Sequence, residues 1–284
     1  APYYGYKGKT AEFAQKWFFQ RYNWYKSEDD LRRFLLKHSA ILDAGCGLGY
    51  LLRWFRSLII EGGGRNKKLE NLLIGFDISR AVDFAIDKNC SGIYLAQADI
   101  MNPPFKKRGF DYIISDGVLH HTPDTREALK RLAALLKPQG VIEFYIYLKK
   151  NPAREFSDDY IRSYTVKMRE RECWEFCKKL TALAKQTSAI KGKITVDRTI
   201  PVIGIEKGIY TPHEFMYYFF MKFFWNKNFT YEENNLVNFD WYHPRYAHRH
   251  TPSEVISWAK ELNMKLENIN VIKSGIAARF RKKL

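Results

Sequence analysis

The sequence predicts an α/β fold: a doubly wound, seven-stranded sheet, mostly parallel with an antiparallel last strand, that is interrupted by a largely helical insertion. Three observations predict it. Apolar strand-like runs alternate with amphipathic segments from residue 40 to residue 147, this alternation is lost over residues 150–250, and it returns at residue 251. Such alternation is typical of a parallel sheet that is covered by helices on both faces.

The first half of the chain supplies most of the expected elements. Apolar residues at helical spacing predict two helices within residues 9–37, and the Gly- and Lys-rich segment 61–68 predicts a flexible surface loop. The remaining predictions are strands at 40–43, 72–76, 92–95, 112–115 and 141–147, with helices at 50–58, from 79 onward and at 125–136.

The second half departs from this order before it returns to it. We expect a polar helix at 160–185, a basic stretch at 191–207 and an aromatic helix at 212–225, followed by a Tyr-, His- and Arg-rich passage. Thr251-Pro-Ser-Glu254 is typical of a helix start, and two strands at 266–273 and 276–280 finish the chain. Because 100 residues far exceed an ordinary connection, the sequence predicts a core of residues 1–149 and 251–284 with a lid of residues 150–250 over the C-terminal edge of the sheet.

Composition restricts the class of protein. The 284 residues contain no apolar run of about 18 residues, so no membrane span is predicted, and the N-terminus lacks the apolar core of a secretion signal. Four scattered cysteines without a CxxC pair indicate reduced thiols and favour a cytoplasmic location. The formal charge of +16 favours an anionic partner, either nucleic acid, anionic lipid or a phosphorylated small molecule, although dispersed basic residues also serve solubility.

The segment Ile41-Leu-Asp-Ala-Gly-Cys-Gly-Leu-Gly49 combines a strand, an acid and a glycine-rich turn before a helix. Glycines at 45, 47 and 49 allow the backbone to turn sharply and to approach a ligand closely. A dinucleotide site would carry a small residue at position 50, where this chain has Tyr50. Asp43 would repel a pyrophosphate but suits a ligand that carries an ammonium group.

This segment resembles motif I of the class I S-adenosylmethionine-dependent methyltransferases, which have a Rossmann-like fold. Further matches are Leu72–Asp77, Ala96–Ile100 and Phe110–Asp116, and Val118–Asp124 with Leu136–Gly140 is similar to the ubiquinone-biosynthesis-type branch. The resemblance implies S-adenosylmethionine as cofactor and S-adenosylhomocysteine as product. It implies a carboxylate at Asp77 for the ribose hydroxyls and one at Asp99 for the adenine amino group. The implied cofactor-binding residues are Asp43, Gly45, Gly47, Gly49, Asp77, Ile78, Asp99, Ile100, Ser115 and Asp116.

Two places are candidates for the chemistry and for acceptor binding. His120 and His121 follow the fourth strand, where a neutral imidazole can take a proton from a hydroxyl acceptor, although for each histidine singly packing against the cofactor or the turn is the favoured alternative. Tyr242, His243, Arg245 and His248 lie in the dense passage before the chain rejoins the core and suit an anionic or hydroxylated acceptor. The spacing of His243, His248 and His250 matches no standard metal site, so no metal is predicted.

These features predict an enzyme that methylates a small molecule, on oxygen or carbon, under the lid. The aromatic segment His213–Trp225 is expected to be a lid helix, with an apolar channel for a lipidic acceptor as the alternative. An RNA methyltransferase is a second hypothesis because of the charge, but Asn102-Pro-Pro-Phe105 stands in the wrong place for a base-methylation motif. A non-catalytic cofactor-binding subunit is a third.

Overall fold

The computed structural model describes residues 9–61, 71–86 and 92–284, so most of the surface loop predicted at 61–68 lies outside the described residues. The contacts divide the chain into two units. Unit 1 contains the described residues up to Leu148 together with His248–Leu284, and unit 2 contains Lys149–Ala247. Among the described residues, no helix is long and apolar enough to cross a membrane.

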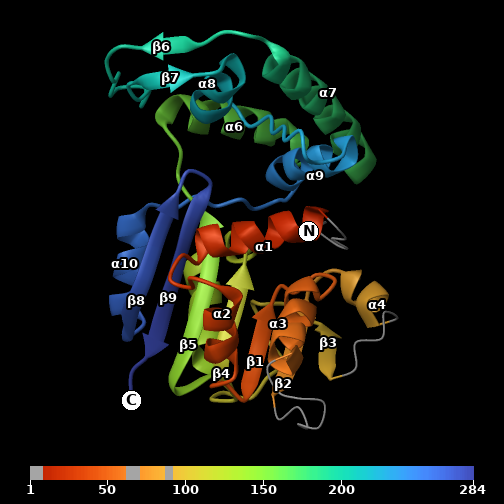
Figure 1. Cartoon of the computed structure of the whole chain (residues 1–284), viewed down its shortest axis with the longest axis vertical. Helices are drawn as coiled ribbons and strands as arrows, with labels where there is room; N and C mark the ends of the chain where they lie inside the picture. The colour runs from red at the N-terminus through yellow and green to blue at the C-terminus, as the bar shows by residue number, and fades with distance from the viewer. Residues whose placement is uncertain (1–8, 62–70, 87–91) are drawn as a thin grey trace. The chain divides into compact units, whose positions relative to one another are not determined.

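Unit 1 is built on a seven-stranded sheet (Figure 1). In spatial order its strands are β3 (Ile93–Gln97), β2 (Leu72–Asp77), β1 (Ala40–Ala44), β4 (Phe110–Asp116), β5 (Leu136–Tyr147), β9 (Gly275–Lys282) and β8 (Met264–Ile272). The first five are parallel, and β9 runs antiparallel to both β5 and β8. The predicted fold, including the antiparallel last strand, is confirmed.

Helices cover both faces of this sheet. The helices of unit 1 are α1 (Lys9–Arg21), α2 (Glu28–Leu35), α3 (Tyr50–Glu61), α4 (Ala81–Ile86), α5 (Thr125–Leu135) and α10 (Pro252–Glu261), with a short 3₁₀ turn η1 (Leu119–His121). Buried side chains of α1, α2 and α3 pack on one face and those of α5 and α10 on the other. Successive side chains of β1 point to opposite faces of the sheet. Ile41 packs on the face that α1, α2 and α3 cover, and Leu42 packs on the face that α5 and α10 cover.

One boundary in unit 1 differs from the prediction. The predicted helix at 125–136 and strand at 141–147 leave residues 137–140 between them, but these residues are part of β5, which begins at Leu136 directly after α5. Gln139 adopts a positive φ of 62°, and the register of β5 against β4 shifts between Phe110 and Tyr112. These residues therefore form an irregular start of the strand, because β5 has three more residues than β4 between the pairs Phe110–Leu136 and Tyr112–Val141.

Unit 2 consists of α6 (Pro152–Thr165), α7 (Glu170–Ala189), the hairpin β6 (Ile194–Val196) and β7 (Gly208–Tyr210), α8 (Pro212–Phe219) and α9 (Tyr231–Tyr242). The single helix predicted at 160–185 is wrong, since two helices occupy residues 152–189. A new helix starts after Arg169, where the Glu172 side chain accepts a hydrogen bond from the Arg169 main-chain N–H. The basic stretch predicted at 191–207 contains β6.

The aromatic helix predicted at 212–225 ends six residues early, at Phe219. Side chains of α9 explain why the chain leaves the helix there. The side-chain oxygen of Asn238 accepts from the main-chain N–H of Phe224, and that of Asn234 accepts from the N–H of Asn226, each at 2.6 Å. These buried amides replace the helical hydrogen bonds that residues 224 and 226 would otherwise make.

Candidate functional site

The glycine turn joins β1 to α3 at the C-terminal edge of the sheet. Gly45, Gly47 and Gly49 have φ values of +91°, +52° and +70°, a region that side chains disfavour. The N–H groups of Gly45 and Cys46 both donate to the carbonyl of Phe76 in β2, at 2.8 and 3.0 Å. The turn is therefore tied to the neighbouring strand.

Asp77, the last residue of β2, connects that strand to the same turn. Its Oδ2 accepts a hydrogen bond from the main-chain N–H of Gly47 at 2.9 Å, while Oδ1 accepts from the main-chain N–H and the hydroxyl of Ser79 at 2.8 and 2.6 Å. A carboxylate oxygen has two lone pairs, so Oδ2 retains one for a ribose hydroxyl.

Asp43 lies beside these groups and is 2% exposed. Burial raises the pKa of Asp43 well above its usual range, and the nearby carboxylates of Asp116 and Asp77 raise it further. Among the described residues, no hydrogen-bond donor pairs with its carboxyl group. A cationic ligand at this edge would favour the ionised form of Asp43, which fits the expected ammonium group.

Asp116, the last residue of β4, is held by two residues of the N-terminal region that sequence reasoning missed. Arg21 Nη2 forms an ion pair with Asp116 Oδ2 at 2.7 Å, and the Tyr22 hydroxyl donates to Oδ1 at 3.0 Å. The Arg21 guanidinium also lies over the Trp17 ring, 4.1 Å from its centroid. The sequence signal for this contact was the occurrence of two polar groups, the Arg21 guanidinium and the Tyr22 hydroxyl, directly after the apolar aromatic residues of α1.

The residues expected at the adenine side differ in exposure. Ile78 is 68% exposed, an unusual position for a large apolar side chain at a strand end, whereas Ile100 is buried. Asp99 Oδ1 accepts from the main-chain N–H of Met101 at 2.8 Å, which leaves Oδ2 for a ligand. Ser115 is fully buried, and its hydroxyl donates to the carbonyl of Ala44, so it serves to join β4 to β1.

These features fit S-adenosylmethionine. Gly45 and Gly49 have backbone conformations that favour glycine. Asp43 is a buried acid without a partner among the described residues, and the apolar side chain of Ile78 is exposed. The site combines carboxylates, which accept hydrogen bonds from ribose hydroxyls and an ammonium group, with apolar side chains that suit the adenine ring. The three glycines, four acids, two isoleucines and one serine that the resemblance implied thus lie in or directly after strands β1 to β4, at one edge of the sheet.

The His120–His121 turn lies directly behind the glycine turn. A Cβ placed on Gly45 would lie 2.4 Å from Cγ2 of Val118, so Val118 contacts the turn closely. The ring of His120 is fully buried, 3.7 Å from the Tyr147 centroid, and neither ring nitrogen has a hydrogen-bond partner among the described residues. His121 is half-buried beside it, with ring centroids 4.2 Å apart.

Burial lowers the pKa of His120 well below its usual range, and the neighbouring imidazoles of His121, His250 and His248 lower it further. The main-chain N–H of His248 donates to the carbonyl of His120 at 2.9 Å, and that of His250 donates to the Tyr147 carbonyl at 2.9 Å. Both residues belong to unit 1, so the chain rejoins the core at His248 instead of at residue 251.

The other predicted acceptor residues lie in unit 2 and have structural contacts there. Tyr242 is fully buried, and its hydroxyl donates to Asp158 at 2.9 Å or to the Lys222 carbonyl at 2.8 Å. His243 stacks on Phe239 at 4.5 Å, and the Arg245 guanidinium lies over the Tyr246 ring. These contacts favour packing for Tyr242, and its contact with the acceptor stays a prediction. Within the described part of the chain, no group of His, Cys, Asp and Glu residues is arranged to hold a metal.

Comparison with known proteins places the chain in a family. A family model described as a methyltransferase domain matches residues 19–181, more than half of the 284 residues. The match begins in α1 and ends in α7, so it includes the glycine turn, the acids of β1, β2 and β4 and the His120–His121 turn.

Curated relatives match over less than half of the chain. The chain is 32% identical over 122 residues to "Probable tRNA methyltransferase 9B" of Mus musculus, a match covering 42% of this chain and 24% of that protein. It is 30% identical over 128 residues to a sterol 24-C-methyltransferase of Schizosaccharomyces pombe, covering 43% of this chain and 29% of that protein. The chain thus spans about a quarter of the length of these relatives.

Solved structures with a similar arrangement are distant in sequence. An S-adenosylmethionine-dependent methyltransferase from Mesorhizobium loti matches with a TM-score of 0.48 and 14% identity, covering 90% of this chain and 99% of that one. The 1,6-didemethyltoxoflavin-N1-methyltransferase of Burkholderia thailandensis matches with a TM-score of 0.46 and 12% identity, covering 97% and 84%. On the family match, the chain belongs to the class I methyltransferases, enzymes that use S-adenosylmethionine as their methyl donor.

Proposed function

We propose that this enzyme transfers the methyl group of S-adenosylmethionine to an oxygen or carbon atom of a small-molecule acceptor. The observation that carries the proposal is the contact of Val118 with Gly45, because it sets the His120–His121 turn against the glycine turn. A proton acceptor and the cofactor site are then parts of one rigid edge of unit 1. That arrangement suits an acceptor whose proton must leave as the methyl group arrives.

The chain's own residues divide the work of binding the cofactor. The turn of Gly45, Gly47 and Gly49 admits the methionine part, Asp43 pairs with its ammonium group and Asp77 accepts from the ribose hydroxyls. Asp99, Ile78 and Ile100 bind the adenine, and Ser115 with Asp116 fixes the end of β4. The bound cofactor supplies an electrophilic methyl group on a sulfonium.

Of the two predicted bases, His121 is the better candidate for contact with the acceptor. Its side chain is half-buried, whereas His120 is completely enclosed by Tyr147 and His121. A group that takes a proton from the acceptor has to be within hydrogen-bond reach of it. We assign His120 to holding the orientation of His121.

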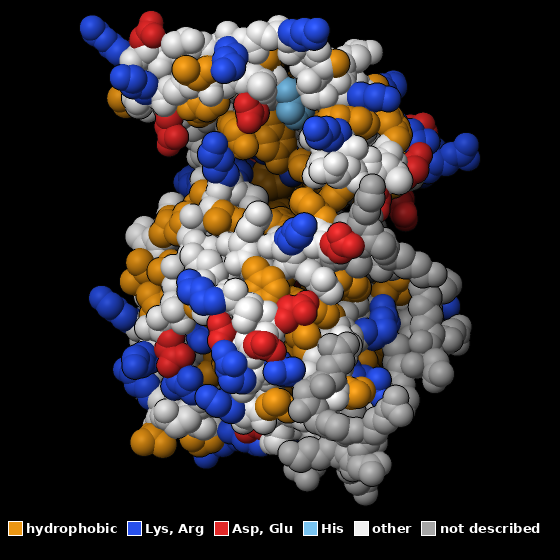
Figure 2. All heavy atoms as spheres, in the orientation of Figure 1, with side chains coloured by type: hydrophobic (Ala, Val, Ile, Leu, Met, Phe, Trp, Pro, Cys, Tyr) orange, Lys and Arg blue, Asp and Glu red, His pale blue; other side chains and the backbone are white. Residues whose placement is uncertain are grey.

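An RNA acceptor is the second candidate, because three of the curated relatives carry the name "Probable tRNA methyltransferase 9B". The formal charge of +16 agrees with it. The distribution of charge favours the small molecule. On the face that Figure 2 shows, Lys and Arg side chains lie scattered among acidic and hydrophobic ones, and they form no continuous basic surface.

Salt dependence of methyl transfer distinguishes the two acceptors. The full chain is incubated with methyl-labelled S-adenosylmethionine and either total tRNA or a panel of small hydroxylated and carboxylated compounds, at about 50 and about 200 mM salt. We expect incorporation into a small molecule with a shallow salt dependence. Incorporation into tRNA that falls at least 10³-fold over that range would establish the RNA acceptor instead.

A further inference from the structure

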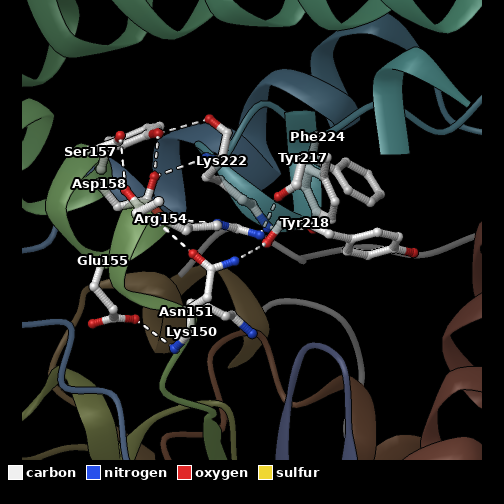
Figure 3. A network of polar contacts seen from close by, with 12 residues as sticks. Lys150, Asn151, Arg154, Glu155, Ser157, Asp158, Tyr217, Tyr218, Lys222 and Phe224 are labelled. Atoms are coloured by element: carbon white, nitrogen blue, oxygen red, sulfur yellow. Dashed lines mark hydrogen bonds and ion pairs between the residues drawn. The ribbon is translucent and has the colours of Figure 1, made fainter. Parts of the chain in front are cut away.

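A cluster of charged and aromatic residues in unit 2 has no part in the cofactor site. It joins α6 to the segment that follows α8 and to the end of α9 (Figure 3). Its centre is the buried ion pair of Arg154 and Asp158, one turn apart on α6, with Arg154 Nε 3.1 Å from Asp158 Oδ2. Arg154 also donates to the main-chain carbonyl of Tyr217.

The Asp158 carboxylate is occupied by other donors and fixes the main chain of Lys222. Its Oδ1 accepts from the Lys222 main-chain N–H at 2.8 Å and from the Tyr242 hydroxyl at 2.9 Å. The Lys222 carbonyl, 2.8 Å from the same tyrosine hydroxyl, is the alternative acceptor of its single proton. The backbone that carries the Lys222 side chain is therefore fixed at its N–H by Asp158 and lies against Tyr242 at its carbonyl.

The Lys222 ammonium, by contrast, forms no ion pair with a carboxylate of the described residues. Its one hydrogen bond is to the Tyr217 hydroxyl, at 3.3 Å. Three aromatic rings surround it, with Nζ 5.4, 5.4 and 5.3 Å from the ring centroids of Tyr217, Phe224 and Trp241. Ring faces attract a cation but cannot accept its three N–H groups as a carboxylate does.

Charged groups of both signs act on one another at this place. Lys150, Arg154 and Lys222 are the cationic side chains, and Asp158 and Glu155 are the carboxylates. Burial lowers the pKa of Lys150 well below its usual range, and Arg154 and Lys222 lower it further. Burial raises the pKa of Tyr217, but Lys222 and Arg154 outweigh that effect, and the net shift is downward.

We infer that the Lys222 ammonium and the Tyr217 hydroxyl form a binding site for the carboxylate or phosphate group of a small organic anion. A bound anion supplies the charged acceptor that the ammonium lacks. The aromatic rings reduce contact with water, which strengthens the pairing of charges, and they favour an organic anion over an inorganic one. Only the further step, that this anion is the methyl acceptor, rests on the proposed function.

Calorimetric titration of the full chain with benzoate, phenyl phosphate and neutral benzamide tests the site without cofactor or turnover. We expect benzoate or phenyl phosphate to bind and benzamide not to bind, and the tighter anion identifies the group that the site accepts. Lys222→Met keeps the side-chain length and the main-chain contacts but removes the charge. It should weaken the anion roughly 10- to 100-fold, and Tyr217→Phe should weaken it about 3- to 10-fold.

Lys185→Met is the matched control, because Lys185 also lies over an aromatic ring, 5.5 Å from the Trp225 centroid, but is exposed. It should leave the affinity unchanged. The inference is overturned if neither anion binds, if Lys222→Met binds them as tightly as the wild type, or if Lys185→Met loses as much. Should Lys222→Met fail to fold, Tyr217→Phe decides by the same criterion. Because no methyl transfer is measured, either result leaves the proposed function to its own test.

Discussion

Val118 fills the space beside Gly45 so closely that a Cβ on the glycine would lie 2.4 Å from Cγ2 of the valine. This contact connects the turn after β1 to the turn after β4. Position 45 requires glycine for two reasons: the Val118 side chain leaves no space for a Cβ, and the backbone φ of +91° is one that other residues rarely adopt.

Gly45→Ala should therefore destabilise the protein by about 2–5 kcal/mol, the sum of the strain of a left-handed backbone and of overpacking. Chemical denaturation measures the free energy of unfolding. Gly117→Ala is the control, since Gly117 has a φ of +79° but no atom within 4 Å of an added Cβ, and it should cost only about 1–2 kcal/mol. Adding Val118→Ala should recover part of the stability of Gly45→Ala. Equal losses in the two glycine variants would refute the contact.

His121→Ala should lower kcat by about 10²- to 10⁴-fold with the acceptor found in the screen, because the proton of the acceptor loses its base. The affinity for S-adenosylmethionine should change little, which calorimetry measures in parallel. A loss of cofactor affinity with an equal loss of turnover would show that His121 contacts the cofactor. His38→Ala, a substitution just before β1 at the opposite edge of the sheet, provides a control that should leave kcat unchanged.

His120 should make the stability of the fold depend on pH. Its pKa is lower in the folded chain than in the unfolded chain, where it is about 6.5. As the pH falls below about 6.5 the unfolded chain takes up the proton first, so the contribution of neutral His120 to stability is present above that pH and is lost below it. The slope is at most about 1.4 kcal/mol per pH unit.

His120→Phe keeps a ring between Tyr147 and His121 but cannot titrate. Denaturation between pH 5 and pH 7 should show a shallower loss of stability on acidification than in the wild type. The pKa of His250 is lowered as well, chiefly by burial, but His250 is present in both proteins and its effect cancels. Identical slopes would contradict the burial of an uncharged His120.

The ion pair of Arg154 and Asp158 should dominate the stability of unit 2. Asp158→Asn leaves a buried guanidinium without its counter-charge and should cost about 3–5 kcal/mol in the free energy of unfolding. The exposed pair of Arg169 and Glu172 is the control, and Glu172→Gln should cost about 1 kcal/mol or less. Similar losses in the two variants would show that the buried pair has no special weight.

The sheet and the cofactor edge could be predicted from the sequence because their signals are local. A short apolar run such as Leu72–Phe76 is typical of a strand in a parallel sheet. Asp77, the acid that follows it, then lies at the same edge of the sheet as the glycine turn, because the carboxyl ends of parallel strands lie at one edge. The resemblance then supplied the roles that spacing alone left open.

Unit 2 could not be predicted in the same detail because its elements are decided by contacts distant in sequence. The end of α8 depends on Asn234 and Asn238, which are 15 or more residues away along the chain. The contact of Arg21 with Asp116 joins residues 95 positions apart, and nothing in the spacing of α1 indicates it. The location of His248 in unit 1 likewise follows from its hydrogen bond to His120.

The central claim is that the glycine turn and the carboxylates at the ends of β1 and β2 bind S-adenosylmethionine. Calorimetric titration of the full chain with S-adenosylmethionine and with S-adenosylhomocysteine tests it most directly. We expect both to bind, and Asp77→Ala to weaken both by about 1–3 kcal/mol, because both contain the ribose whose hydroxyls lose their acceptor. Asp83→Ala, a change of an exposed acid on α4, should leave both affinities unchanged. Absence of binding by the wild type, or equal affinity in wild type and Asp77→Ala, would contradict the account.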